Sequence, residues 1–394
     1  MAGGILVLYA DSGALGHKIL ANNYLDLLQR KGYRVRKADI LETDGSRASR
    51  SVVRTYFWML KRAGWLWRFL YDHWFRIPLA NGFRIWIMPR RFRSAQGVLL
   101  REMPDLIIST HPVATSVANL LKAKGKISSK VLVAFSDWHT QRFWVFPHVD
   151  EYLVASSDQR DDLRALGVPE DRITVTGILA ADAYYDLPCK KEARVQLGLP
   201  LNKQIVLLMG GGKGWGIERI IRALARSVPG VFAVVIAGSE DRKAHLAKLA
   251  SGLDSESTTL EITGFTEATL YFAAADLLIS KTGGMTTTEA FLTRLPLLPV
   301  LPAPAQDEHN AEALISRGAV FTPDKAAYLG HQVYSILKNR AVMGRVAENA
   351  SRLVSSETPG IVLALLEGKL MCDLNGNDRD GQSENEILWT EEVL

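Results

Sequence analysis

Cysteine is scarce in this chain of 394 residues, which holds only Cys189 and Cys372. No CxxC spacing occurs, so the sequence excludes a disulfide framework and a cysteine-based zinc site, and it favours a reducing compartment. Long apolar runs are also missing, since none approaches the ~20 residues that span a bilayer. The first residues, MAGGILVLYADSG, lack the basic part of a secretory signal. We therefore expect a cytoplasmic protein.

Acidic residues are almost missing from one segment of the chain. Between Arg47 and Arg93 there are many arginines and lysines, and Asp72 is the only acid. Residues 373–394 show the opposite bias, because they are acidic and polar, and they are predicted to form a disordered tail. The net charge of +5 is therefore unevenly spread.

Apolar runs followed by glycine-containing turns and helical patterns occur in two series. The first begins with 5–10 and continues through a helix pattern at 18–31 and a strand at 33–38. The second begins at 204–209 and leads into a helix at 216–227. This alternation predicts an α/β chain of two Rossmann-like domains, whose parallel sheets face an interdomain cleft. Further strands are expected at 105–109, 130–135, 151–155, 173–176, 232–237, 260–262, 277–279, 297–300 and 319–321.

The domain boundaries follow from these two series. We expect the N-terminal domain to span 1–182 and the C-terminal domain to span 183–358. A linker is expected at 180–200, where prolines and charged residues gather. Residues 359–372 are expected to form a helix that crosses back to the first domain.

The segment 277–290, LLISKTGGMTTTEA, predicts a strand, a tight turn and a helix. Gly283 and Gly284 permit close approach of the backbone, and Thr286–Thr288 are expected to supply N-cap hydroxyls. Backbone amides at a helix start attract anions, which suits a diphosphate, with Glu289 in the first helical turn accepting hydrogen bonds from a ribose diol. Taken alone, the segment is equally well explained as a plain strand–turn–helix connection.

A polar stretch follows the next predicted strand. Gln306 and Asp307 lie at the carboxyl end of that strand, where ligands of α/β proteins bind, and they can hydrogen-bond sugar hydroxyls. A polar loop that caps the following helix is the simpler explanation when this stretch is taken alone.

The order of these features resembles the donor half of family 28 glycosyltransferases of GT-B fold. Both sequences have, in the same order, a Gly-Phe pair after a strand, the motif Lys-x-Gly-Gly-x-Thr, a glutamate, and the motif Gln-acid-x-x-Asn-Ala. The similarity is greatest to bacterial processive diacylglycerol glucosyltransferases and plant monogalactosyldiacylglycerol synthases, and more distant to the lipid-linked N-acetylglucosaminyltransferase of peptidoglycan synthesis. The resemblance implies that Gly283–Thr286 bind the phosphates, Glu289 the ribose, Gln306 and Asp307 the hexose, and the stretch around Gly264 and Phe265 the uracil.

The glycine-rich loop Gly210–Gly214 is a second candidate for holding the diphosphate, with Lys213 adding positive charge for the leaving UDP. It lacks the Walker pattern, and no DxD pair follows a predicted strand, so we expect neither a metal nor a cofactor beyond the UDP-sugar donor. The candidate donor-binding residues are Gly210, Gly211, Gly212, Lys213, Gly264, Phe265, Lys281, Gly283, Gly284, Met285, Thr286, Glu289, Gln306, Asp307 and Asn310.

The N-terminal half resembles the same group over 135–177, with Asp137, Trp144 and Asp150 at matching spacings and Gln141 where the group commonly has a histidine. Its first loop resembles the group's Gly-x-Gly-His turn, with Ala14 in place of the first glycine. His17 is then expected to act as the catalytic base at a helix start. Asp137 is the competing candidate, either as the base or as the group that orients His17. A His17 that caps a helix or binds phosphate is the non-catalytic alternative.

Tryptophans lie among the arginines and lysines of the basic segment, residues 47–93. On a helix, Arg54, Lys61 and Arg68 share one face, and Trp58 and Trp65 flank it. Such residues together are typical of a membrane interface, although a buried helix with solvated arginines is also compatible with the pattern. No nucleic-acid-binding module is indicated. The candidate membrane-binding residues are Arg54, Trp58, Lys61, Trp65, Arg68, Trp86, Arg90 and Arg91.

The resemblance and the basic segment together predict an inverting transferase. It would move glucose or galactose from a UDP-hexose to diacylglycerol and make a β-linked glycolipid, bound peripherally to the anionic inner face of the cell membrane. Three alternatives stay open: transfer of N-acetylglucosamine to a polyprenyl-linked acceptor, a UDP-sugar epimerase, and a non-catalytic sugar-nucleotide-binding protein. The N-terminal domain would bind the acceptor and the membrane, and the C-terminal domain the UDP-sugar.

Overall fold

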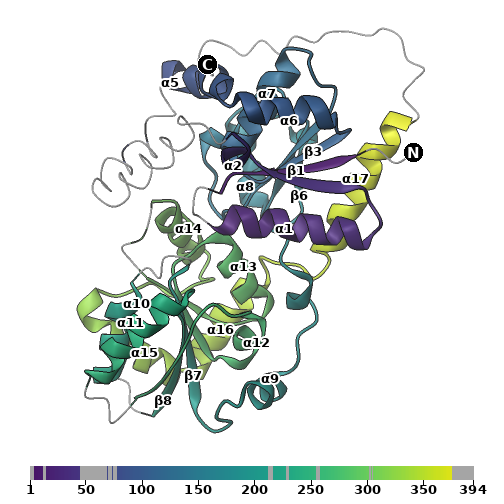
Figure 1. Cartoon of the computed structure of the whole chain (residues 1–394). Coiled ribbons are helices and arrows are strands. Elements are labelled where there is room, and N and C mark those ends of the chain that lie inside the picture. Colours follow the sequence, from purple (N-terminus) through teal and green to yellow (C-terminus); the bar gives the residue numbers. More distant parts are fainter. Residues whose placement is uncertain are drawn as a thin grey trace. The chain divides into compact units, whose positions relative to one another are not determined.

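The computed structural model describes residues 4–11, 15–44, 69, 73, 78–211, 216–227, 230–253, 258–300, 303 and 305–374. The chain divides into two compact units. Unit 1 comprises Met1–Leu179 and Glu357–Leu394, and unit 2 comprises Ala180–Ser356 (Figure 1). None of the helices among these described residues is long and apolar enough to cross a membrane.

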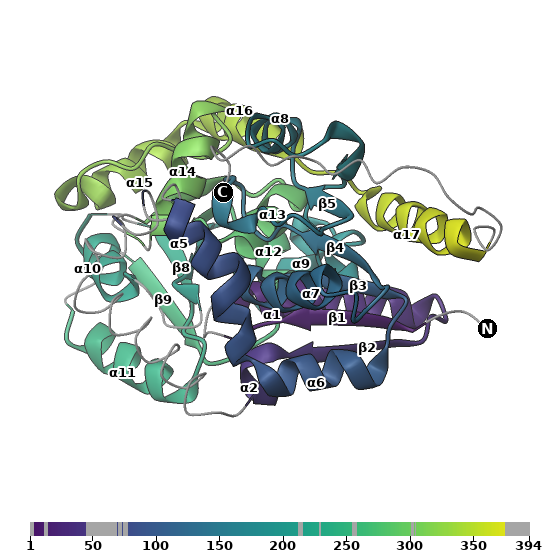
Figure 2. The same ribbon diagram turned by 90° about the horizontal axis from the view of Figure 1, so that it is seen from above.

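Unit 1 is built on a six-stranded parallel sheet with the order β2-β1-β3-β4-β5-β6. The strand order reverses next to β1, which pairs with β2 on one side and with β3 on the other; Figure 2 shows β1 and β2 side by side. Ligands of such sheets bind at the carboxyl ends of the strands where the order reverses. The strands are β1 (Ile5–Tyr9), β2 (Val35–Asp39), β3 (Leu106–Ser109), β4 (Lys130–Ala134), β5 (Glu151–Val154) and β6 (Ile173–Val175).

Helix α1 (Leu15–Arg30) shows how the helices of unit 1 follow from their sequence. Its buried residues Leu20, Tyr24, Leu27 and Leu28 recur at helical spacing and form one face. The other helices of the unit are α2 (Ile40–Asp44), α5 (Pro78–Gly82), α6 (Arg93–Glu102), α7 (Pro112–Ala123), α8 (Ser157–Ala165) and α17 (Thr358–Leu374), with shorter turns η2 (Phe83–Ile87), η3 (Met88–Arg91), η4 (Arg142–Trp144) and η5 (Glu170–Arg172).

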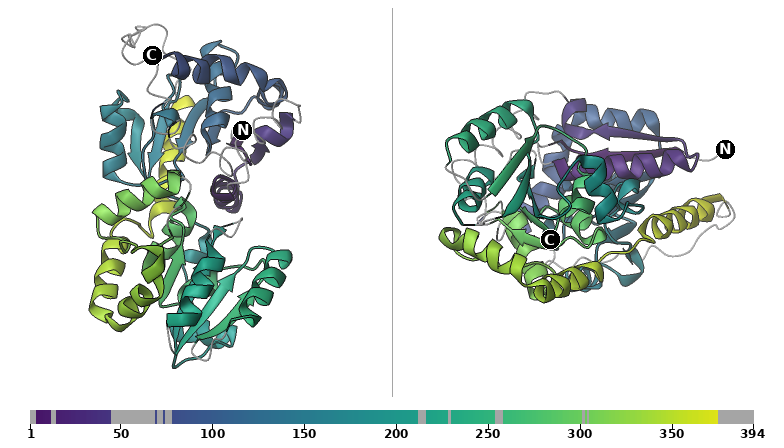
Figure 3. Two further views of the ribbon diagram at one scale, coloured as in Figure 1. Left: turned by 90° about the vertical axis from the view of Figure 1, so that its left-hand side faces the viewer. Right: turned by 90° about the horizontal axis from the view of Figure 1, so that it is seen from below.

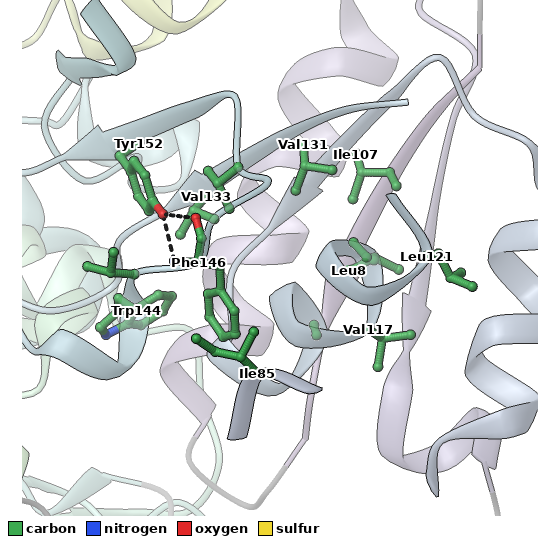
Figure 4. Packing of buried hydrophobic residues seen from close by; sticks show 14 of the residues in the cluster. Leu8, Ile85, Ile107, Val117, Leu121, Val131, Val133, Trp144, Phe146 and Tyr152 are labelled. Atoms are coloured by element: carbon green, nitrogen blue, oxygen red, sulfur yellow. Dashed lines mark hydrogen bonds between the residues drawn. The ribbon is translucent and has the colours of Figure 1, made fainter. Parts of the chain in front are cut away.

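The core of unit 1 combines aliphatic strand residues with a group of aromatic side chains (Figure 4). Leu8, Ile107 and Val131 from three neighbouring strands lie in it with Trp144. Tyr152 is also buried, and its hydroxyl donates to the carbonyl of Phe146 at 3.0 Å and accepts from the amide of Phe146 at 2.9 Å. Because both hydrogen-bonding capacities of the hydroxyl are satisfied, this tyrosine can be buried without a large desolvation cost.

The C-terminal helix α17 is tied to unit 1 by a buried ion pair. Lys369 Nζ lies 2.7 Å from Glu151 Oε2, and Glu151 is only 1% exposed. Thr174 donates to the other carboxylate oxygen of Glu151 at 2.5 Å. At the start of the helix, the side chain of Thr358 packs against Gly177. The C-terminal segment therefore folds as part of the N-terminal half of the chain.

Unit 2 is built on a five-stranded parallel sheet with the order β11-β10-β7-β8-β9, seen in two further views in Figure 3. Both faces of its central strands are buried, as a parallel sheet covered by helices requires. Its strand order reverses between β7 and β10. The strands are β7 (Gln204–Met209), β8 (Val231–Ile236), β9 (Thr258–Thr263), β10 (Leu277–Ser280) and β11 (Leu297–Pro299).

Helices α10 (Ile217–Ser227), α11 (Glu240–Ser251) and α15 (Leu329–Lys338) share a core with β7 and β8. The remaining elements of the unit are η6 (Asp182–Tyr184), α9 (Lys190–Leu197), α12 (Thr269–Ala274), α13 (Gly284–Leu292), α14 (Ala305–Ser316), η8 (Ala326–Tyr328) and α16 (Arg340–Ser351).

Two predicted elements differ from the structure. The segment 319–321 is not a strand, because a single hydrogen bond from Phe321 N to Leu297 O at 2.9 Å joins it to β11. The expected linker at 180–200 contains helix α9, which begins after Cys189. Glu192 favours that start, since its carboxylate accepts a hydrogen bond from the amide of Cys189 at 3.1 Å.

Candidate functional site

The loops after β7 and β10 meet at the reversal point of the unit 2 sheet, and the side chain of Lys281 lies across both. A Cβ atom at Gly211 would come within 2.7 Å of Lys281 Cε, and one at Gly283 within 2.9 Å of Lys281 Nζ. Gly211 also has a positive φ of 64°, which disfavours other residues. The two glycines therefore leave the space that the lysine occupies.

Lys281 is held in place by Asp307. Its Nζ lies 3.1 Å from both carboxylate oxygens of Asp307, which is only 2% exposed. Thr282 donates to the carbonyl of Asp307, and Asn310 Nδ2 donates to the carbonyl of Thr282 at 2.9 Å. These bonds join the β10 loop to the start of α14. Asp307 and Asn310 thus fix the loop, and Gln306 beside them is half-buried.

Helix α13 starts earlier than the sequence predicts. Its N-cap is Gly283, and no side chain caps it, so the expected capping by Thr286–Thr288 is wrong. The Thr288 hydroxyl donates instead to the carbonyl of Gly284 at 2.8 Å, one turn back. The amides of Gly284, Met285 and Thr286 have no partner within the helix, which makes this start suitable for binding an anion.

Glu289 consequently lies in the second turn of α13, where the sequence prediction placed it in the first. Its carboxyl is buried, and burial raises its pKa to about 7, although a hydrogen bond from Tyr184 lowers it in part. Tyr184 is buried too, with its ring edge-on to Phe272 at 5.5 Å between centroids. Burial, and secondarily the charge of Glu289, raise the pKa of Tyr184 well above its usual value.

Tyr184 is absent from the sequence-based site. Nothing in its local sequence marks it, because η6 precedes the first strand of unit 2 and α13 lies far along the chain. Only the packing of unit 2 brings its hydroxyl to Glu289.

The ends of β8 and β9 continue the same edge of the sheet. Gly238 N donates to the carbonyl of Gly264 at 3.4 Å, and a Cβ at Gly238 would lie 3.9 Å from the carbonyl of Gly211. The exposed carboxylate of Glu240 lies against Gly264, so a side chain at this position would require Glu240 to move. Phe265 is 82% exposed, so its ring is accessible for stacking against a base. The described part of the predicted donor set therefore lies along one edge. Gly210 directly follows β7 there, and Gly212 and Lys213 lie outside the described residues.

His17 lies in the first turn of α1, at the reversal point of the unit 1 sheet. Its Nδ1 is 2.7 Å from the carbonyl of Thr110 and 2.9 Å from the hydroxyl of Ser136. A carbonyl can only accept, so Nδ1 carries the proton. In the neutral ring Nε2 then holds the lone pair, which is the state that a general base needs.

His111 lies beside His17 and is a residue that the sequence analysis missed. The two rings are edge to face, with centroids 4.5 Å apart. His111 caps α7, because its Nδ1 accepts a hydrogen bond from Val113 N at 3.1 Å. Burial, and then the neighbouring His17, lower the pKa of His111 well below its usual value, so it stays neutral. Its position two residues after β3, at the reversal point, is the signal that could have identified it.

Asp137 follows Ser136, which contacts His17. Its backbone carbonyl accepts from Gln159 Nε2 at 2.9 Å, which fixes the loop after β4 against α8. The two further residues of the matching pattern are structural: Trp144 stacks on Phe135 with centroids 4.8 Å apart, and Asp150 accepts from Val131 N at 2.6 Å. The choice between His17 and Asp137 as base stays a prediction.

Residues 19–179 match the model of the monogalactosyldiacylglycerol (MGDG) synthase family. The matched segment covers less than half of the chain and begins two residues after His17. It contains the environment of His17: Thr110, His111 and Ser136. The processive diacylglycerol beta-glucosyltransferase of Staphylococcus epidermidis (strain ATCC 12228 / FDA PCI 1200) is 30% identical over 225 residues, 56% of this chain and 56% of the relative. The match thus spans little more than half the length of that curated relative.

Two solved structures resemble the whole chain. MurG of Acinetobacter baumannii has a TM-score of 0.58 and 16% identity, over 93% of this chain and 99% of that one. The UDP-GlcNAc 2-epimerase of Neisseria meningitidis, solved bound to UDP-GlcNAc, has a TM-score of 0.59 and 13% identity, over 93% and 100%. These likenesses, together with the two parallel sheets, confirm the predicted α/β fold of GT-B type.

The segment that matches the MGDG synthase family also contains the described part of the basic segment. Arg90 and Arg91 are exposed, as are Phe83 (44%) and Ile87 (50%), whereas Trp86 is half-buried against the core. The other predicted membrane-binding residues, Arg54, Trp58, Lys61, Trp65 and Arg68, lie outside the described residues.

Arg84 belongs to the interior, although the sequence groups it with the surface arginines. It donates to Asn81 and to the carbonyls of Phe143 and Val145, and it lies over the ring of Phe146 at 4.2 Å. Burial lowers its pKa to about 9. This arginine therefore holds η2 against the η4 region and is not available to a membrane.

Proposed function

We propose that this protein is an inverting glycosyltransferase that moves a hexose, glucose or galactose, from UDP to diacylglycerol at a membrane surface. The observation that carries the proposal is the contact between His17 Nδ1 and the carbonyl of Thr110, next to a segment that matches the MGDG synthase family. Thr110 accepts the proton on Nδ1, so that Nε2 is the basic nitrogen. The similarity to a processive diacylglycerol beta-glucosyltransferase supports the same acceptor.

In the proposed reaction, the hydroxyl oxygen of diacylglycerol attacks the anomeric carbon of the sugar. Its proton passes to His17 Nε2, while the bond between the anomeric carbon and the β-phosphate oxygen breaks and UDP leaves with the electron pair. Attack from the face opposite UDP converts an α-linked donor into a β-linked product. His111 is neutral beside the base, so it does not oppose the positive charge that His17 acquires.

Unit 2 would bind the donor. The amides at the start of α13 and the ammonium of Lys281 stabilise the diphosphate, and the pair with Asp307 keeps that ammonium over the glycine loops. Lys213 would add a further positive charge, and no cofactor is needed for this chemistry. Glu289 would accept hydrogen bonds from the ribose diol, with Phe265 against the uracil.

The described surface of η2 and η3 supports a peripheral attachment to the membrane. Phe83 and Ile87 expose apolar surface beside the exposed cations Arg90 and Arg91. An apolar residue next to an arginine suits the boundary between acyl chains and anionic headgroups, where each cation contributes about 1 kcal/mol. We place the protein on the cytoplasmic face, where UDP-sugars would reach it.

The test uses the purified full chain, vesicles that contain diacylglycerol, and UDP-glucose, UDP-galactose and UDP-N-acetylglucosamine in separate reactions. Mass spectrometry of the lipids should detect a hexosyl-diacylglycerol. H17A should lower the rate by about 10²–10⁴-fold while UDP binding stays the same. H331A, which removes an exposed histidine of α15, is the matched control and should keep full activity. If UDP binds but no lipid is glycosylated by any donor, the protein is a binding protein and the proposal is wrong.

A further inference from the structure

A cavity of unit 2 lies at the opposite edge of the sheet from the loops after β7 and β10. Its volume is about 550 Å³, within the range of small-molecule sites. It is lined by Gln204, which begins β7, and by Asp276 and Pro296, which directly precede β10 and β11. These are amino ends of strands, whereas Gly211 and Lys281 follow the carboxyl ends. The six residues of β7 separate the two edges by roughly 20 Å.

Positive charge dominates the lining of this cavity. Five of its residues are cations, Lys190, Arg194, Lys203, Arg294 and Arg340, and Asp276 is the single acid. Asp276 is already engaged, because it pairs with Lys190 at 2.8 Å and Arg194 at 2.7 Å. The structure thus offers no further carboxylate from the lining to balance the other three cations.

Arg194 forms the rigid floor of the cavity. Besides Asp276, it donates to the carbonyls of Ala274 at 2.9 Å and Lys203 at 3.1 Å. Asp276 also accepts from the amide of Ile205 at 2.8 Å. Arg194 and Asp276 therefore link the start of β7 to the start of β10 by hydrogen bonds.

Arg294, Arg340 and Lys203 are the cations left for a ligand. Among the residues that the structure describes, Arg340 and Lys203 form no ion pair, and Lys203 only donates to the hydroxyl of Thr259 at 3.4 Å. Arg294 pairs with Glu348, but that pair is exposed and accessible to water. Exposed pairs of this kind contribute little to stability and are readily exchanged for a more strongly charged partner.

Three of the lining cations occupy positions that local structure disfavours. Lys190 and Arg340 are the first residues of α9 and α16, where the positive end of the helix dipole opposes a cation. Arg294 has a φ of 54° in the turn that ends α13, where glycine is the favoured residue. Lys190 is compensated by its pair with Asp276 and Arg294 by its exposed pair with Glu348, whereas Arg340 forms no ion pair among the described residues. Such conflicts between local preference and sequence are expected at binding sites.

We propose that this cavity binds a multiply charged, phosphate-bearing anion. Guanidinium groups bind phosphate oxygens through paired N–H donors, and an anion between Arg294 and Arg340 would also offset the unfavourable helix start. The site is independent of the proposed transferase reaction, since none of its residues belongs to the donor-binding or acceptor-binding groups.

The experiment is calorimetric titration of the full chain with inorganic pyrophosphate, with UDP present throughout to occupy the nucleotide loops. One pyrophosphate should bind per chain. R294G and R340A should each weaken binding by about tenfold or more. R294G is the informative variant, because glycine favours the backbone conformation at this position and the fold should be retained. K248A removes an exposed cation of α11 outside the cavity and should leave the affinity unchanged.

A second arm uses vesicles of phosphatidylcholine with and without phosphatidic acid. The anion is a lipid headgroup if two results occur together. Vesicles with phosphatidic acid bind R294G and R340A less tightly than K248A, and pyrophosphate does not bind to the protein. If pyrophosphate binds with the predicted dependence on these arginines, a soluble phosphate suffices. Equal affinity of R294G, R340A and K248A in both arms, or no binding in either, would overturn the proposal.

Discussion

Replacement of Glu289 by glutamine provides a direct test of the buried carboxyl beside Tyr184. Burial raises the pKa of this group from an ordinary value of 4.5 to about 7 in the folded protein. The folded chain therefore binds more protons than the unfolded chain between these two pH values, and its stability falls as pH rises through that window. The difference between the two pKa values corresponds to about 3 kcal/mol.

Glutamine keeps the shape of the protonated carboxyl and does not titrate. Relative to the parent, E289Q should therefore gain stability as pH rises from about 4.5 to about 7, by up to about 3 kcal/mol, and the gain should level off above pH 7. Urea denaturation of both chains at intervals from pH 5 to 8 measures this difference. E312Q, at an exposed glutamate of α14, is the control.

The same substitution tests the proposed contact with ribose. If the ionised carboxylate accepts hydrogen bonds from the diol, UDP binding by the parent should strengthen as pH rises through about 7, and E289Q should bind UDP more weakly at pH 8. A stability difference that does not vary with pH would show that the carboxyl is not desolvated as the structure indicates. If UDP binding does not change with pH, the contact between Glu289 and ribose is refuted, but the burial of the carboxyl is not.

Three further predictions address the site and its support. Y184F should lower the free energy of unfolding by about 1–2 kcal/mol, because the buried carboxyl of Glu289 loses its donor; thermal unfolding measures this, and an unchanged transition would contradict the hydrogen bond. G211A should destabilise unit 2 by about 1–2 kcal/mol and weaken UDP binding, since alanine disfavours the positive φ and displaces Lys281; unaltered UDP affinity would remove the loop from the site. K369M should lower the free energy of unfolding by about 3 kcal/mol, because Glu151 stays buried without its cation. The double variant K369M/E151Q should regain part of that loss. Urea denaturation measures both changes.

The sequence determined the fold class and the positions of most strands. Apolar runs, glycine turns and helical periodicity are local properties, and a parallel sheet buried on both faces leaves a strong local signal. The pattern at 277–290 likewise marked the loop that carries Lys281 and the start of α13. It could not place the helix start, because Gly283 is the N-cap of α13 and no side chain caps the helix.

Which residues share a site depends on the tertiary structure. His111 lies beside His17, and Tyr184 beside Glu289, because strand order and helix packing bring together segments far apart in the chain. The structure also separated residues that look alike in the sequence, since Arg84 is buried while Arg90 and Arg91 are exposed. The basic cavity at the amino ends of β7, β10 and β11 has no local signature, because its cations come from four places: α9, the residue before β7, the turn after α13, and α16. Periodicity in one segment reports which face is buried, but contacts between segments depend on the order in which the strands pair.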